Sequence, residues 1–84
     1  MKTEKKIPKR KQSKPHPIDI RVGKRIKYFR LLRGMSQTDI AKQIGVRFQQ
    51  VQKYESADNR ISSSRLYLIA EVLGVGIEDF FKDD

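Results

Sequence analysis

The sequence contains no cysteine and a single histidine, His16. Without thiols it can form neither a disulfide framework nor a thiolate metal site, and an intracellular location is favoured. One histidine cannot make a zinc site. A Ser/His/Asp set, a metal-ligand cluster and a phosphate-binding glycine loop are also missing, so we expect no enzyme, no cofactor and no small-molecule ligand.

Long hydrophobic runs are missing too. No stretch approaches the roughly 18 apolar residues of a membrane span, and the N-terminus lacks the apolar core of a signal peptide. The sequence therefore predicts a soluble, cytoplasmic protein with no membrane partner.

Acidic charge is scarce except at the C-terminal end. The 84 residues carry 19 Lys/Arg against 10 Asp/Glu, a formal net charge of +9. Basic residues outnumber acidic ones by seven to two in residues 1–19 and by eleven to three in residues 20–65, but the ratio is one to five in residues 66–84. This uneven distribution predicts that one face of a single small domain meets a polyanion.

The start of the chain differs in composition from the rest. Residues 1–18 are poor in apolar side chains and rich in basic ones, and Pro8, Pro15 and Pro17 interrupt any helix there. We interpret residues 1–18 as a disordered basic arm and residues 19–84 as the folded domain. His16, in the arm, is assigned no role.

Helical spacing begins at Asp19, which is a candidate cap. Apolar residues recur on one stripe, which predicts a first helix that ends near Gly34. The stripe comprises Ile18, Val22, Ile26, Phe29 and either Leu31 or Leu32. Ser36 and Asp39 then resemble a capping box, with aspartate in place of the commoner glutamate, so a second helix is expected from Gln37.

The second and third helices are joined by a very short connection. The apolar stripe of the second helix comprises Ile40, Ala41 and Ile44. Gly45 ends this helix, and a third one is expected at about residues 48–56, with Val51 and Tyr54 on its inner face. Two helices joined by a three- or four-residue turn that contains glycine are typical of a helix-turn-helix.

The third helix carries an unusual number of amide side chains. At about 100° per residue, Gln49 and Lys53 lie opposite Val51, and Gln50 and Gln52 flank them. This face is either an ordinary solvated surface or a face that enters the DNA major groove, where glutamine pairs with adenine and lysine reaches guanine. The basic charge and the turn favour the second interpretation, which makes Gln49, Gln52 and Lys53 candidate base contacts.

Two stretches resemble a known family. The core motif of the Cro/CI-like (lambda-repressor-like, XRE-type) helix-turn-helix family is matched by "MSQTDIAKQIGVRFQQVQKYE", and its closing helices by "ISSSRLYLIAEVLGVGIEDFF". The resemblance spans residues 22–81. It implies an all-α, compact five-helix domain that binds operator DNA, usually as a dimer on a palindromic site, and regulates transcription.

The resemblance also assigns roles to single residues. It implies a phosphate contact for Gln37 and base contacts for Phe48, Gln49 and Lys53. Phe48 stands where related repressors have glutamine, so contact with a thymine methyl group and partial packing are equally open. Arg47 replaces a hydroxyl residue that often caps the third helix, which removes a capping oxygen and adds a potential phosphate partner.

Glu55 falls on the buried side of the third helix, where a carboxylate must be paired. The resemblance implies Arg30 as its partner, and a bidentate bond would satisfy both groups. The alternative is an exposed Glu55 at the end of the helix.

The remaining segment contains the last candidate contacts. Asn59 and Arg60, after the third helix, are candidate DNA backbone contacts. A fourth helix is expected to start at a serine near position 62 or 63 and to end at Gly74. Its apolar stripe comprises Leu66, Ile69, Ala70 and Leu73, and Tyr67, Val75, Ile77, Phe80 and Phe81 complete an apolar C-terminal end. Part of this end, including Phe80, is expected to stay exposed and to pair two copies as a homodimer.

Three functions are compatible with these features. The leading one is a sequence-specific regulator that binds double-stranded DNA and is thereby associated with the nucleoid. The second is an antitoxin or adaptor that uses the same fold to hold a protein partner, and the third is a nonspecific nucleic-acid binder. Footprinting separates the first from the third, and a co-purifying protein would favour the second.

Overall fold

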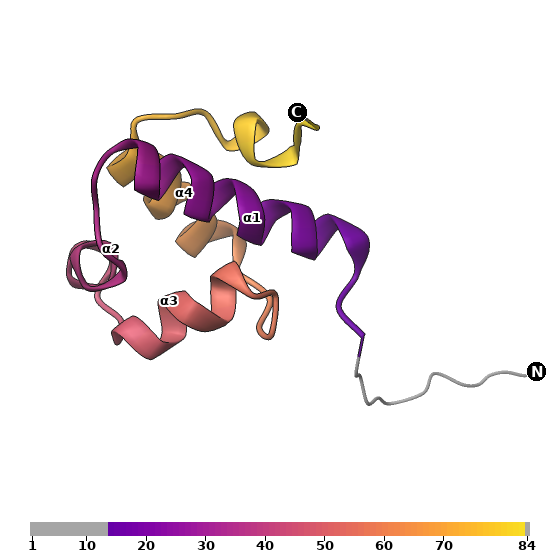
Figure 1. Cartoon of the computed structure of the whole chain (residues 1–84), viewed down its shortest axis with the longest axis horizontal. Coiled ribbons are helices and arrows are strands. Elements are labelled where there is room, and N and C mark those ends of the chain that lie inside the picture. Colours follow the sequence, from indigo (N-terminus) through magenta and orange to yellow (C-terminus); the bar gives the residue numbers. More distant parts are fainter. Residues whose placement is uncertain (1–13, 84) are drawn as a thin grey trace, which may run out of the picture.

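The computed structural model describes residues 14–83, which form four α-helices and one 3-10 helix (Figure 1). The elements are α1 (Pro17–Leu32), α2 (Gln37–Ile44), α3 (Phe48–Glu55), α4 (Ser63–Leu73) and η2 (Ile77–Phe81). The all-α prediction is confirmed, but the expectation of five α-helices is wrong. Gly74 ends α4 at φ 70°, and the Asp79 carboxylate accepts the N–H of Gly76 at 2.9 Å, so the fifth element is a short 3-10 turn.

The first helix begins at Pro17, earlier than the expected Asp19. His16 is its N-cap, because its Nδ1 accepts a hydrogen bond from the N–H of Ile18 at 3.0 Å. Pro17 occupies the first helical position, where a backbone N–H would have no partner within the helix, so the missing N–H of proline costs no hydrogen bond. The interpretations of His16 as a residue without a role and of Asp19 as the cap are therefore wrong. The rest of the expected arm, residues 1–13, lies outside the described residues.

The hydrophobic core lies between the helices and η2. Its buried members include Val22, Ile26, Ile40, Ile44, Val51, Tyr54, Leu66, Ile69, Leu73 and Phe80. Phe80 is 0% exposed, so its expected place on an exposed dimer surface is wrong, and Phe81 is the exposed residue of the two.

Ile18 and both alternatives for the end of the expected α1 stripe, Leu31 and Leu32, are exposed instead of buried. Leu31 and Leu32 lie more than roughly 100° around the helix from Ile26 and therefore point away from the core. Ile18 lies in the first turn, and Figure 1 shows that this end of α1 projects beyond α3 and η2. The apolar pattern of α1 is longer than the part of the helix that other elements cover.

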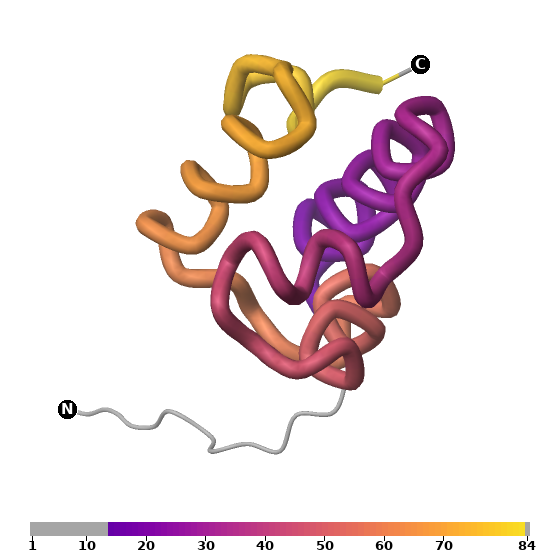
Figure 2. Tube along the Cα trace, turned by 90° about the vertical axis from the view of Figure 1, so that its left-hand side faces the viewer, coloured from indigo at the N-terminus to yellow at the C-terminus, as the bar shows by residue number. Residues whose placement is uncertain are grey.

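The start of α2 and its turn into α3 have the predicted local geometry. The Ser36 hydroxyl oxygen accepts the N–H of Asp39 at 3.0 Å, and the Asp39 carboxylate accepts the N–H of Ser36 at 2.8 Å, which completes the capping box. Gly45 ends α2 at φ 76°, and Val46 donates its N–H to the Ala41 carbonyl at 3.0 Å. This turn sets α3 across α2 (Figure 2).

The capping box also makes the start of α2 sensitive to acid. Hydrogen bonds from the Ser36 backbone N–H and from its hydroxyl hold the pKa of the Asp39 carboxyl below its ordinary value. The stabilisation of the folded domain by the Asp39 carboxylate is therefore fully present at a pH above the ordinary carboxyl pKa. It is lost as the pH falls through the lowered pKa of Asp39 in the folded domain.

The C-terminal segment runs along α1 on the side opposite α3 (Figure 1). There Arg21 pairs with Asp83 at 2.9 Å, and Arg25 donates to the Asp79 carbonyl at 3.0 Å. Part of the basic charge is thus used within the domain, and the acidic end of the chain lies away from α3.

Candidate nucleic-acid interface

The third helix turns a polar face to solvent. Its exposed residues include Phe48, Gln49, Gln52 and Lys53, all of which are candidate base contacts. Val51 and Tyr54 on the opposite side are buried. Phe48 is 42% exposed, so its ring is accessible although part of it is covered. Arg47 is exposed before the helix and makes no side-chain capping bond.

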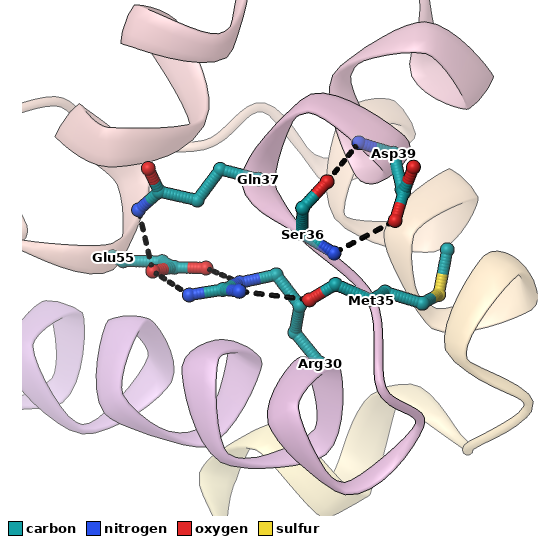
Figure 3. A network of polar contacts seen from close by, with 6 residues as sticks. All are labelled: Arg30, Met35, Ser36, Gln37, Asp39 and Glu55. Atoms are coloured by element: carbon teal, nitrogen blue, oxygen red, sulfur yellow. Dashed lines mark hydrogen bonds and ion pairs between the residues drawn. The ribbon is translucent and has the colours of Figure 1, made fainter.

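Glu55, the last residue of α3, is held by side chains from two other elements (Figure 3). Its Oε2 accepts from Arg30 Nε at 2.6 Å, and its Oε1 accepts from Arg30 Nη2 and from Gln37 Nε2, both at 3.0 Å. Arg30 Nη1 also donates to the Met35 carbonyl at 2.8 Å. The side chains of Arg30 and Glu55 are only 8% and 5% exposed. The network therefore joins α1, α2 and α3 in one arrangement.

Gln37, the candidate phosphate contact, belongs to the same network. Its amide nitrogen carries two N–H groups, and Glu55 accepts one of them. No other residue within 14–83 bonds to the Gln37 amide, so the second N–H is available to a ligand oxygen. Gln37 can therefore join an outside acceptor to the buried pair.

The loop after α3 carries the other two candidate backbone contacts. It turns through Ala57 at φ 65°, a left-handed conformation that few non-glycine residues adopt. Asn59 is exposed, and Arg60, 83% exposed at its side chain, lies 3.3 Å from the Asp19 carboxylate. An ion pair this exposed contributes little, so Asp19 does not lock Arg60 in place.

An open groove of about 630 Å³ lies beside this face, between α3 and the start of α4. Its lining includes Arg47, Gln49, Gln50, Lys53, Tyr54 and Arg65. Every charged residue of the lining is basic, so the groove favours an anion. Arg65 was not predicted from the sequence, although a cation in the first turn of a helix, where the dipole disfavours it, was an available signal.

Gly23 is a second residue that sequence reasoning missed. It lies in the middle of α1, where a Cβ atom would be 2.6 Å from the carbonyl oxygen of Glu55 and 2.7 Å from that of Tyr54. Only a residue without a side chain lets α1 approach the end of α3 this closely. A mid-helix glycine, which costs about 1 kcal/mol relative to alanine, was the available signal.

The part of the chain that the structure describes offers no group of three or more His, Cys, Asp or Glu side chains that could hold a metal ion. None of the helices in that part is long and apolar enough to cross a membrane.

Two short helices joined at a left-handed glycine, with the second exposing amides and lysine, define a helix-turn-helix domain. The model of the helix-turn-helix family matches residues 26–80, more than half of the chain. The chain belongs to the XRE-type, Cro/CI-like helix-turn-helix family of DNA-binding transcriptional regulators.

Known proteins resemble the chain in sequence and in structure. An uncharacterized HTH-type transcriptional regulator of Sinorhizobium medicae is 47% identical over 72 residues, which cover 86% of this chain and 52% of the relative. The chain thus spans about half the length of that curated relative. The regulator of biofilm formation SinR, solved in complex with DNA, is 26% identical with a TM-score of 0.67, covering 73% of this chain and 98% of SinR.

A third match is an enzyme. The structure of FeII HppE in complex with substrate gives a TM-score of 0.70 at 22% identity, covering 76% of this chain but only 37% of HppE. This likeness shows a shared fold in one part of HppE. The matched family is one of transcriptional regulators, and the Sinorhizobium medicae relative is named as one.

Proposed function

We propose that the protein is a sequence-specific regulator of transcription that binds double-stranded DNA by placing α3 in the major groove. The observation that carries the proposal is the exposed row of Gln49, Gln52 and Lys53 on a helix held by the buried Arg30–Glu55 pair. Amide and lysine side chains can pair with adenine and guanine edges there. The net charge of +9 supports a polyanionic partner, and the likeness to SinR, solved with DNA, supports DNA. The protein would act in the cytoplasm, at the nucleoid.

The candidate contacts divide into two classes. Phe48, Gln49, Gln52 and Lys53 are proposed to meet base edges from the exposed face of α3. Gln37, Arg47, Asn59 and Arg60 are proposed to meet phosphates, because they surround that face at the start of α2, before α3 and after α3. Phosphate contacts orient the domain, and base contacts give it a sequence preference.

The experiment that tests this function compares two glutamines. Gln49→Ala is expected to weaken binding to the preferred DNA sequence by about 1–3 kcal/mol and to relax preference at one position per half-site, with nonspecific affinity nearly unchanged. Gln37→Ala is expected to weaken binding to every sequence alike, because a phosphate carries no base identity. Each variant is competed between a duplex selected from random DNA and an unselected duplex at one salt concentration.

The matched control is Gln43→Ala, which removes an exposed amide from α2 rather than from α3 and should change neither affinity. Melting curves are needed for Gln37→Ala, since this change also removes a hydrogen bond to Glu55. Equal losses on both duplexes for Gln49→Ala would mean that its amide reads no base.

The regulator is further proposed to act as a homodimer on a palindromic site. One small module makes few base contacts, and two half-sites multiply the discrimination. Exposed apolar side chains on α4 and η2, Tyr67, Leu68 and Phe81, are candidates for the contact between copies.

Phe81→Asp is therefore expected to give a folded monomer with weaker operator binding, because it puts a charge on the exposed surface and leaves the buried Phe80 in place. Sedimentation of wild type and variant at micromolar concentration measures the effect. Leu31→Asp, on an exposed part of α1, is the comparison for a general effect of a new charge. A wild-type protein that sediments as a monomer and protects one half-site would contradict the dimer.

A further inference from the structure

The side of α1 that faces away from the core carries large apolar side chains. Within residues 14–83, nine large hydrophobic side chains are exposed, and five of them lie on this helix: Ile18, Ile20, Tyr28, Leu31 and Leu32. In Figure 1, α4 lies behind α1, and α3 and η2 lie on either side of it; Figure 2 shows α1 at one edge of the molecule. Apolar side chains scattered singly over a surface are ordinary, whereas a group of them on one helix indicates an interaction surface.

Five exposed residues form one row along this side of α1. At about 100° per residue, all of them lie between roughly 100° and 200° around the helix from the buried Ile26. We call the row the outer stripe, and it comprises Ile20, Lys24, Lys27, Tyr28 and Leu31. It is roughly 16 Å long, which is three turns of helix. Its two lysines bond to no residue within 14–83, so the stripe combines apolar contact area with positive charge that the domain does not use.

Two features prepare the outer stripe for contact. A groove of about 260 Å³, lined in part by Pro17 and Ile20, adjoins its N-terminal half, and the charged residues of the lining are four cations and one carboxylate. The ring of Tyr28 is 51% exposed but supported, because the Arg25 guanidinium lies 5.3 Å from its centroid and the Phe29 ring meets it edge-on at 5.2 Å. A tyrosine that is ordered before binding loses little side-chain entropy in a contact, which is a property of interface hot spots.

We propose that the outer stripe binds an acidic amphipathic helix of another protein. The stripe is straight and follows a single helix, so a second helix can lie along it and place its apolar side chains against Ile20, Tyr28 and Leu31. Asp or Glu side chains beside that apolar row would then meet Lys24 and Lys27. The inference goes beyond the proposed function and does not rest on it. Because the stripe and the exposed face of α3 lie on different sides of the domain, both can be occupied at once (Figure 1).

Two other occupants fit the outer stripe less well. A DNA backbone has no use for three apolar side chains between the lysines, since its affinity comes from its phosphates. The α1 helix of a second copy would meet the stripe with like charge: Lys24 lies opposite Lys27 in an antiparallel pair and opposite itself in a parallel pair. An acidic helix satisfies both the apolar and the basic side chains.

The first test uses a synthetic helical peptide with leucine along one face and glutamate on both sides of it. NMR spectra of the isotope-labelled full chain locate the binding. The peptide is expected to shift backbone amide signals of α1 between Ile20 and Leu32, with and without a duplex present. A control peptide with glutamine in place of each glutamate should bind about tenfold more weakly, and the difference should shrink at high salt, because salt screens exposed charges.

The second test reverses a charge on the protein. Lys24→Glu is expected to weaken binding of the glutamate peptide about fivefold, because an attraction between exposed charges becomes a repulsion. A peptide with lysine in place of glutamate should bind the Lys24→Glu variant more tightly than it binds wild type. Leu31→Asp, which removes an apolar contact and adds a repelling charge, should weaken binding of the glutamate peptide by about tenfold or more. The matched control is Lys42→Glu, the same change at an exposed position of α2, which should alter peptide affinity less than twofold.

Melting curves of each variant show that it is folded before its affinity is compared. Four outcomes would each overturn the proposal. The peptide shifts no signal at millimolar concentration; it shifts signals of α3 and a duplex displaces it, so that it only imitates DNA; or a duplex itself shifts signals of the outer stripe, which is then a nucleic-acid surface. The fourth is self-association of the wild type that Lys24→Glu abolishes, which would make a second copy the occupant. The peptide experiment without DNA decides the inference even if the protein binds no duplex.

Discussion

Arg30→Ala is expected to lower the free energy of unfolding by about 3 kcal/mol or more. The change leaves the Glu55 carboxylate, 5% exposed, with a single hydrogen bond from Gln37, and it leaves the Met35 carbonyl without its donor. A buried charge without a partner costs far more than the net value of the pair that it formed. Chemical denaturation of the purified domain measures the loss.

A double-mutant cycle shows whether the two side chains act together. Glu55→Ala alone should also cost about 3 kcal/mol, and the double variant should cost less than the sum, because no unpaired charge is left behind. Lys27→Ala, at an exposed position of the same helix, is the control and should change stability by about 0.5 kcal/mol or less. Additive losses would mean that Arg30 and Glu55 do not interact in solution.

Local signals in the sequence predicted most of the helix boundaries. Gly45 and the Ser36–Asp39 box work through their own backbone and nearest neighbours, so their geometry follows from residue type and spacing. The prediction of the N-cap of α1 was wrong for two reasons. His16 is an uncommon capping residue, and Pro17 was interpreted as a helix breaker although proline is well suited to the first helical position. The prediction for Ile18 was wrong because a stripe does not show where the neighbouring elements end, and the prediction for Leu31 or Leu32 was wrong because both lie too far around the helix from Ile26.

Part of the candidate site could also be predicted from the sequence, because it depends on local geometry within one helix. The outward direction of Gln49 and Lys53 follows from helical geometry within one element. The partner of Glu55 required knowledge of how α1 lies on α3, which spacing along the chain does not contain and which the resemblance supplied. Arg65 depends on the same kind of long-range packing, since its groove exists only where α4 meets α3.

Gly23→Ala is expected to destabilise the domain by about 2 kcal/mol or more, although alanine is the better helix former by about 1 kcal/mol. The new methyl group would lie within 2.7 Å of two backbone carbonyl oxygens of α3, which cannot rotate away as a flexible side chain could. The helices must separate to relieve the overlap. Because the Arg30–Glu55 bonds span the same two helices, they should weaken in the same variant.

DNA binding gives this prediction a second readout. Displacing the end of α3 from α1 would change the position of the exposed face of α3 that is proposed to contact bases, so affinity for a selected duplex should fall even at temperatures where the Gly23→Ala variant is folded. The control is Lys24→Ala, which introduces alanine at the neighbouring, exposed position of α1. It should leave both stability and DNA affinity near the wild-type values. A Gly23→Ala protein that melts at a higher temperature than wild type would contradict the prediction. It would show that the gain in helix propensity outweighs the steric overlap, and that α1 and α3 are farther apart in solution than the distance of 2.6 Å between an added Cβ and the Glu55 carbonyl oxygen implies.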